Sequence, residues 1–187
     1  MIGLSIIEQA VKVLKKGGTI IYPTETLWGI GCDATNEAAV DKVSIIKDRD
    51  LVKGYILMVD EIDMLTGYVD SFSKSIQELL SSEMPTTMVF PKCYGLPSNV
   101  IRSDGTVAFR VAKTKLCKEL IRSFGKPIIS TSANPSKEIT AIEKSKIPAS
   151  ILDCADYVLN LPDGQEMSMV PSRILRIDSG GSPQRIR

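Results

Sequence analysis

Histidine is absent from this 187-residue sequence, and its absence removes a whole group of chemistries. Ser-His-Asp and Cys-His catalysis, histidine-ligated metals and acid–base catalysis by imidazole all need that side chain. Any reaction that this chain catalyses must therefore depend on positioning, on electrostatics, or on carboxylates and lysines.

Cysteine is scarce and scattered. The four cysteines form no Cys-x-x-Cys pair and lie far apart, at Cys32, Cys93, Cys117 and Cys154. This spacing argues against a thiolate zinc site and against a redox couple. We interpret all four as small buried hydrophobic residues in a reducing compartment.

Excess charge and long apolar runs are missing too. A net charge of +1 gives no overall positive field that would attract nucleic acid, although a local basic patch is compatible with it. Charged residues interrupt the apolar N-terminal segment at Glu8, Lys12, Lys15 and Lys16, so it does not resemble a signal peptide, and no other run is long enough to span a bilayer. We expect one domain, residues 1–187, in the cytosol and away from membranes.

Helical and strand patterns alternate along the chain, which predicts an α/β fold on one sheet. Helices are predicted at 5–16, 36–47, 71–81 and 114–124, with Asn36 and Thr114 as N-caps and Gly125 as the end of the last one. Strands are predicted at 19–22, 55–59, 87–90, 107–111, 127–130, 157–159, 174–177 and 184–187, with a polar loop at 160–171. The pattern leaves the strand order open.

Three short segments are candidates for chemistry. The first, Tyr-Pro-Thr-Glu-Thr-Leu-Trp-Gly-Ile-Gly at 22–31, begins where a strand ends and combines two threonines, a carboxylate and two glycines. Loops past strand ends gather ligand groups in α/β proteins, and glycines permit close backbone approach. A structural turn with Trp28 in the core explains the segment equally well.

The second segment is basic. Lys47, Arg49 and Lys53 follow the end of a predicted helix and precede an apolar strand. Three neighbouring cations suit a phosphate clamp. The alternative, which is the more usual one for an isolated cluster, is that they complement the helix dipole and face solvent.

The third segment, Ser-Thr-Ser-Ala-Asn-Pro-Ser at 130–136, directly follows a predicted strand. Its hydroxyl, amide and backbone groups can donate to an anion, although this composition is also common in ordinary loops. Neither a Walker A motif nor Gly-x-Gly-x-x-Gly occurs, so a nucleotide would be held in another way.

The order and spacing of these segments resemble the YrdC-like family. The resemblance rests on Gly-Gly-Thr-Ile-Ile-Tyr-Pro-Thr-Glu-Thr-Leu-Trp-Gly-Ile-Gly-Cys at 17–32, then Lys-x-Arg at 47–49 and Ser-x-Ser-Ala-Asn at 130–134. Val-Ala-Phe-Arg-Val at 107–111 and Val-Pro-Ser at 170–172 match further family segments, so the resemblance covers nearly the whole chain. It departs at Asp50 and Gly54, where the family has prolines, and at Arg173, where the family has threonine.

The resemblance implies a twisted mixed sheet flanked by helices, with a concave basic cleft. It implies the synthesis of threonylcarbamoyl-AMP from threonine, bicarbonate and ATP with Mg²⁺, as the first step towards threonylcarbamoyladenosine in tRNA. It also implies a downstream tRNA threonylcarbamoyl transferase complex as partner.

The family's functional positions carry over residue by residue. Lys47 and Arg49 match its catalytic basic cluster, which meets the nucleotide. The other nucleotide-binding positions are Lys53, Ser132, Asn134 and, more weakly, Arg185. The threonine-binding positions are Thr24, Arg110, Ser130 and Ser172, and no metal-ligating residue is implied.

Two other functions remain open. A YrdC-like RNA-binding or ribosome-associated module without synthase activity would need only a basic surface, whereas the retained Lys-x-Arg and Ser-Ala-Asn segments favour the synthase. Carbamoyl transfer in hydrogenase maturation uses a similar domain within a much larger protein, and this chain is too short for that arrangement.

Overall fold

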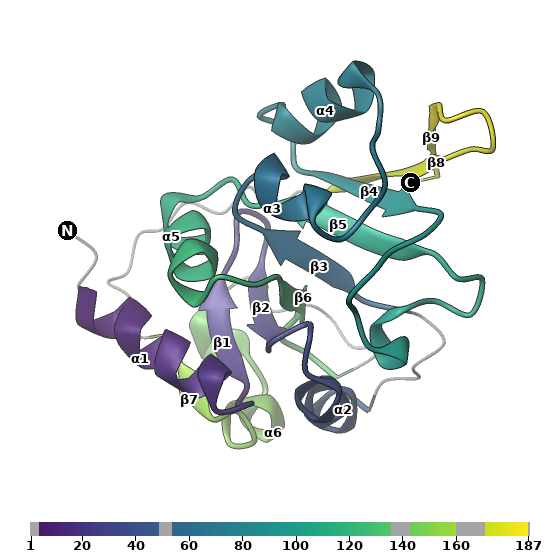
Figure 1. Cartoon of the computed structure of the whole chain (residues 1–187). Helices are drawn as coiled ribbons and strands as arrows, with labels where there is room; N and C mark the ends of the chain where they lie inside the picture. The colour runs from purple at the N-terminus through teal and green to yellow at the C-terminus, as the bar shows by residue number, and fades with distance from the viewer. Residues whose placement is uncertain (1–3, 49–53, 136–142, 160–170, 187) are drawn as a thin grey trace.

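The computed structural model of the chain describes residues 4–48, 54–135, 143–159 and 171–186. Its nine strands form one mixed sheet in the order β7-β1-β2-β6-β3-β5-β4-β8-β9 (Figure 1). The strands are β1 (Ile20–Pro23), β2 (Trp28–Gly31), β3 (Ile56–Val59), β4 (Thr86–Phe90), β5 (Val107–Val111), β6 (Ile128–Ser132), β7 (Tyr157–Val158), β8 (Arg173–Ile177) and β9 (Pro183–Arg185). Pairs β1–β7, β3–β5 and β4–β8 are parallel, and the other five are antiparallel.

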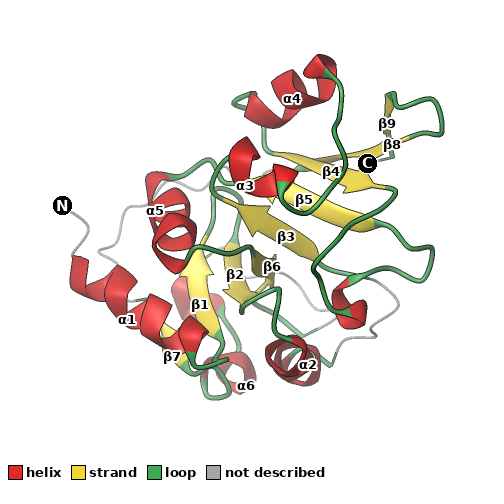
Figure 2. Cartoon of the chain, viewed as in Figure 1, coloured by secondary structure: helices red, strands yellow, loops and turns green. Residues whose placement is uncertain are grey.

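Six α-helices in the described ranges flank the sheet (Figure 2). They are α1 (Leu4–Lys15), α2 (Glu37–Ile46), α3 (Ile62–Thr66), α4 (Lys74–Ser81), α5 (Lys115–Phe124) and α6 (Ala149–Leu152). Figure 1 shows α1 and α5 side by side, away from the β8–β9 hairpin. The predicted α/β class with one mixed sheet and flanking helices is therefore confirmed.

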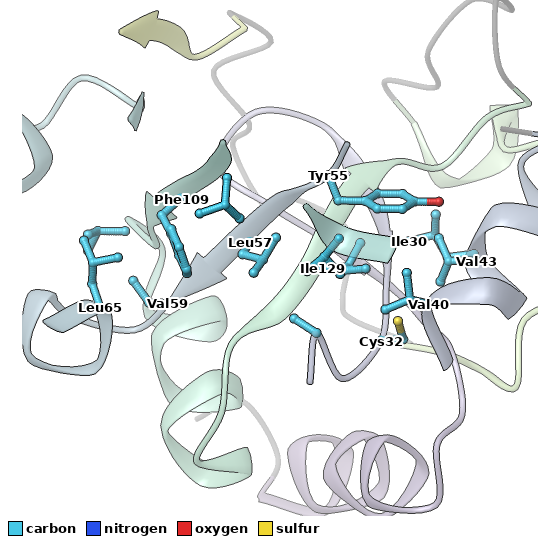
Figure 3. Packing of buried hydrophobic residues seen from close by; sticks show 14 of the residues in the cluster. Ile30, Cys32, Val40, Val43, Tyr55, Leu57, Val59, Leu65, Phe109 and Ile129 are labelled. Atoms are coloured by element: carbon cyan, nitrogen blue, oxygen red, sulfur yellow. The ribbon is translucent and has the colours of Figure 1, made fainter. Parts of the chain in front are cut away.

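One face of the sheet is apolar along its length. Side chains from alternate positions, such as Leu57, Phe109 and Ile129, pack against Val40 and Val43 of α2 in one buried cluster (Figure 3). The same cluster contains buried residues of α3, α4 and α6. Every second residue of a strand points to this face, so the strands carry apolar residues at those positions.

The opposite face of the sheet is apolar at one end of the strands and polar further along. At one end Tyr22, Met58 and Ile128 lie under α1 and α5 in a second apolar cluster. On β6, Ser130 lies two residues after Ile128 and therefore on the same face. On β5, Arg110 pairs with Met58 of β3 and also lies on this face. Helices α1 and α5 therefore cover only part of this face, and its polar part is where a ligand site would be expected.

Most predicted elements are confirmed, including the caps at Asn36 and Thr114, whose side chains accept from the amides of Ala39 and Cys117, and the end of α5 at Gly125. The reading of 22–31 as a loop was wrong. Residues Trp28–Gly31 form β2, which pairs with β1 in a tight hairpin. Two glycines hide this strand from a propensity-based reading, because glycine is a poor strand former.

The prediction that all four cysteines are buried was wrong for two of them, because Cys32 and Cys117 are buried whereas Cys93 is only partly buried and Cys154 is exposed. Smaller differences concern element boundaries and two short helices. Helix α4 begins at Lys74 rather than at 71, with Ser73 as its N-cap. The short helices α3 and α6 were not predicted. Strand β6 continues to Ser132, two residues beyond its predicted end at 130, so the first three residues of the segment at 130–136 belong to the strand.

Candidate active site

A cavity of about 350 Å³ opens on the polar part of the second sheet face. Its lining comes from the β1–β2 turn, the segment leading into β3, the end of β6, Arg110 of β5 and the beginning of β8. Four predicted threonine-binding residues (Thr24, Arg110, Ser130 and Ser172) and one predicted nucleotide-binding residue (Ser132) are among these lining residues. Segments that are far apart in the sequence therefore meet at one cavity.

The β1–β2 turn is held by the hydroxyl of Thr24. Its Oγ1 donates to the carbonyl of Leu27 at 2.8 Å and accepts from the amides of Thr26 and Leu27, each at 3.2 Å. Gly29 follows in β2, where an added Cβ would lie 3.3 Å from both the Thr24 methyl group and the Thr131 carbonyl. In this segment the Thr24 hydroxyl thus holds the turn, and Gly29 lets the backbones of β2 and β6 approach closely beside the cavity.

Arg110 is the most deeply buried cation in the cavity lining, at 5% exposed. Its Nε lies 3.1 Å from Oε1 of Glu25, which is 7% exposed, and its Nη2 donates to Oγ of Ser130 at 3.5 Å. A buried ion pair persists only when the two charges compensate one another, because each alone is expensive to remove from water. The pair holds Arg110 with its Nη groups towards the serine that lines the cavity.

Hydroxyl groups surround this guanidinium. Arg110 is directly across from Thr87 in β4, and Oγ1 of Thr87 lies 2.9 Å from Oγ of Ser172, which is buried just before β8. Tyr22 is fully buried on the same face, and burial raises the pKa of its phenol well above the ordinary value, so it stays neutral. A guanidinium that is held by Glu25 and lies near neutral hydroxyls suits the carboxylate and hydroxyl of a small amino acid.

Lys47 caps the C-terminus of α2, and its side chain is only 1% exposed. Its ammonium donates to the backbone carbonyls of Ser132 and of Asn134, the latter at 2.5 Å. Lys47 therefore fixes the end of β6 and the loop that follows, and it is not among the described residues that line the cavity. Its contact with phosphate stays a prediction.

Asn134 is also buried, at 4% exposed, and its Nδ2 donates to the carbonyl of Pro135 at 2.8 Å. The amide of Ala133, between the two carbonyls that Lys47 contacts, donates to the carbonyl of Trp28. The Ser-Ala-Asn segment is thus a bound strand end, anchored to both β2 and α2.

Other predicted positions are not brought to the cavity or are not described. Arg49 and Lys53 lie outside the described residues. Arg185 is exposed on the edge strand β9 and pairs with Leu175, whose side chain belongs to the apolar face. The register therefore places Arg185 on the side of the sheet opposite the cavity.

Trp28 satisfies both earlier interpretations, since it belongs to the apolar cluster and also lines the cavity. Sequence reasoning missed Glu25 and Thr87 as site residues, and also Arg102, which lines the cavity from the loop before β5. The carboxylate in Pro-Thr-Glu-Thr was visible, but nothing in the sequence pairs it with Arg110. Thr87 and Arg102 acquire their significance only from strand register and tertiary placement.

Within the described ranges, no group of three or more Asp, Glu, Cys or His side chains is arranged to hold a metal ion. None of the described helices is long and apolar enough to cross a membrane. The described lining of the cavity offers cations and hydroxyl groups. The expected overall basic character of the cavity stays a prediction.

Comparison with known proteins agrees with this geometry. The model of the Sua5/YciO/YrdC family, described as telomere recombination, matches residues 12–187. A relative from Pseudomonas fluorescens named threonylcarbamoyl-AMP synthase is 37% identical over 82% of this chain and 84% of its own. A relative of the same name from Pseudoalteromonas translucida is 34% identical over 86% of this chain and 88% of its own.

Solved structures share the fold. Sua5 from P. abyssi, complexed with L-threonine, superposes with a TM-score of 0.85 at 22% identity over 97% of this chain. The present chain spans about half of that protein, 53% of its length. E. coli YciO superposes with a TM-score of 0.80 at 22% identity, over 98% of this chain and 88% of its own. On the family match and the identity to these relatives, the chain belongs to the Sua5/YciO/YrdC family.

Proposed function

We propose that this protein is a threonylcarbamoyl-AMP synthase, which makes threonylcarbamoyl adenylate and pyrophosphate from L-threonine, bicarbonate and ATP. The observation that carries the proposal is the cavity in which Arg110, backed by Glu25, faces Ser130 and lies one strand from the Thr87–Ser172 pair. Relatives of that name, at 34% and 37% identity over most of both chains, support it.

The amino-acid end of the site would be built around Arg110. Its guanidinium would bind the threonine carboxylate, and Ser130 and Ser172 would lie within reach of the carboxylate or the side-chain hydroxyl. Thr24 would contribute its methyl group and the shape of the turn, because its hydroxyl already bonds to the backbone. This arrangement would orient the amine of threonine towards the open part of the cavity.

The reaction asks little covalent chemistry of the protein. The threonine nitrogen attacks the carbon of bicarbonate, water leaves, and a carbamate forms. A carbamate oxygen then attacks the α-phosphorus of ATP, and the bond to the pyrophosphate oxygen breaks. Orientation of the two substrates and stabilisation of the charge on phosphorus would supply the rate, so a chain without histidine suffices.

The nucleotide would lie towards the end of β6, where Ser132 lines the cavity and Lys47 holds the strand end. Arg49, Lys53 and Asn134 are proposed to join it on the strength of the resemblance. Because no described acidic cluster fits a metal, Mg²⁺ would be bound mainly by triphosphate oxygens, as is usual for this ion. It would supply neutralisation of phosphate charge.

The product is an unstable mixed anhydride that needs an acceptor. We propose tRNA, acted on by a downstream transferase complex, as its destination, and the cytoplasm as the place of the reaction. An RNA-binding module without synthase activity is the alternative outcome of the test. It would bind RNA with a steep salt dependence and consume no ATP in response to threonine.

The test is pyrophosphate release from ATP, Mg²⁺ and bicarbonate, measured with and without threonine. Wild type and Arg110→Lys form the informative pair, since lysine keeps the charge but loses the two-pronged geometry. We expect threonine-dependent release in wild type and at least a tenfold higher threonine KM in R110K. No threonine-dependent release from folded wild type would refute the proposal.

A further inference from the structure

Arg102 is a cation in the cavity lining that neither the sequence motifs nor the proposed reaction has used. It lies between the 3₁₀ turn at Ser98–Val100 and β5, and its amide donates to the carbonyl of Thr106 at 2.9 Å. Its Nε is buried and has no hydrogen-bond partner. A buried guanidinium nitrogen without a partner is costly, so it points to an acceptor that the site provides when filled.

Gly54 is the residue that admits this side chain. An added Cβ at Gly54 would lie 2.5 Å from Cγ and 3.2 Å from Nε of Arg102, so the arginine stem lies across the backbone leading into β3. Gly54 also has φ +57°, which other residues adopt with strain. Glycine at this position therefore leaves the space that Arg102 occupies.

Strand register places Arg102 and Arg110 at opposite ends of the cavity. On β3, Ile56 pairs with Ser130 of β6, so Gly54, two residues earlier, lies level with Ser132. Met58, two residues later, pairs with Arg110. The two levels are four residues apart on one strand, or roughly 13 Å. One arginine is thus at the proposed amino-acid end and the other at the Ser132 end.

Within the part of the chain that the structure describes, the charged groups near Arg102 have other partners. The nearest acidic side chain along the loop, Asp104, forms an ion pair with Arg176 and accepts from the Thr106 hydroxyl at 2.6 Å. The Lys47 ammonium at this end bonds to two backbone carbonyls and does not line the cavity. Among the described residues, Arg102 is therefore the cation that faces the cavity near Ser132.

We propose that Arg102 binds a phosphate group of the nucleoside triphosphate. This inference rests on the proposed function, because it needs a nucleotide at the Ser132 end of the cavity. Arg102 and Arg110 then divide the work, one holding the phosphates and the other the amino-acid carboxylate. Because the two arginines lie at different levels of β3, each can meet a different anionic substrate.

The test is direct binding, by calorimetry, of ATP, inorganic pyrophosphate and threonine to wild type and variants. Arg102→Gln keeps the length of the side chain and removes its charge, and Arg122→Gln, on the exposed face of α5, is the matched control. We expect R102Q to weaken ATP and pyrophosphate binding about 10- to 100-fold, since one charge-assisted contact is lost. Threonine affinity should stay within twofold, and R122Q should match wild type for all three ligands.

Unchanged ATP and pyrophosphate affinity in folded R102Q would overturn the inference, and so would an equal loss of threonine affinity, which would put Arg102 at the amino-acid end. Arg102→Lys supplies a check on folding, because it should recover part of the phosphate affinity. Binding is measured without turnover, so the two proposals fail separately. If threonine-dependent pyrophosphate release is absent but R102Q still loses ATP affinity, the synthase proposal fails and the phosphate role of Arg102 stands.

Discussion

Oε1 of Glu25 lies 3.1 Å from Nε of Arg110, and both side chains are more than nine-tenths buried. The two residues come from the β1–β2 turn and from β5, and strands β6 and β3 lie between that hairpin and β5 in the sheet. Their pairing therefore ties the turn to the middle of the cavity floor. Neither oxygen of Glu25 makes a hydrogen bond, so Arg110 is its main electrostatic compensation.

Replacing Glu25 by glutamine should damage both stability and threonine binding. Arg110 would keep its charge without its partner, and breaking one side of a buried pair costs about 3–5 kcal/mol. The freed guanidinium would also lose its orientation towards Ser130, so the threonine KM should rise more than kcat falls. Urea denaturation and steady-state kinetics measure the two effects.

Glu61→Gln is the matched control, because Glu61 pairs with Arg122 on the exposed surface. Exposed pairs contribute about 1 kcal/mol or less, so E61Q should remain close to wild type. If E25Q is as stable as E61Q and binds threonine normally, Glu25 does not position Arg110.

Lys47→Met should lower the free energy of unfolding by at least about 2 kcal/mol. Methionine fills the space but leaves the carbonyls of Ser132 and Asn134 without the donor that they have now, and each buried unsatisfied acceptor costs about 1–3 kcal/mol. Lys12→Met, on the exposed side of α1, is the control and should change stability by about 0.5 kcal/mol or less. Equal stability of the two variants would mean that Lys47 does not hold the strand end.

Gly31→Ala should be strongly destabilising, by about 2 kcal/mol or more. An added Cβ would lie 2.2 Å from the backbone carbonyl oxygen of Ile129, so β2 and β6 would have to move apart. At Gly67 an added Cβ would lie an ordinary 3.4 Å from the carbonyl oxygen of Met64, so Gly67→Ala should be neutral or slightly stabilising. A thermal scan compares them, and equal midpoints would contradict the close approach of these strands.

Stability should fall at alkaline pH. Burial raises the pKa of the Cys117 thiol from about 9 to about 12, and it also raises the pKa values of Cys32 and Tyr22. The folded state keeps these protons where the unfolded chain has released them, so raising the pH favours unfolding. This contribution is fully present below about pH 9 and is lost as the pH rises through the folded pKa values.

Urea titrations at pH 7.5, 9 and 10 measure this slope, and Cys117→Ala should reduce it. The C117A midpoint at pH 7.5 measures the loss of stability that comes from removing the thiol volume alone. A free energy of unfolding that stays constant from pH 7.5 to 10 would contradict the burial of these three groups as acids.

The elements that the sequence predicted well have local causes. Asn36 and Thr114 cap their helices with their own side chains, and Gly125 ends α5 with φ +84°. The strands with short, nearly continuous apolar runs, such as β3 and β5, were located to within one residue. Such features depend on a few neighbouring residues, so they can be read without the fold.

What the sequence could not supply depends on distant segments. Strand β2 needs glycine at position 31 because its backbone lies close to that of Ile129, and only the assembled sheet shows this close approach. The ion pair of Glu25 and Arg110 joins residues far apart in the chain. Arg185 was assigned to the nucleotide from the family resemblance alone, whereas its register with Leu175 puts it on the other face.

Threonylcarbamoyl-AMP synthesis is tested most directly by identifying the reaction product. The protein is incubated with ATP, Mg²⁺, ¹³C-bicarbonate and ¹⁵N-threonine, and the mixture is analysed at once by mass spectrometry. We predict an adenylate that contains AMP, one threonine nitrogen and one bicarbonate carbon, formed together with pyrophosphate. AMP or ADP without that adenylate, or an adenylate that lacks the labelled carbon, would contradict it.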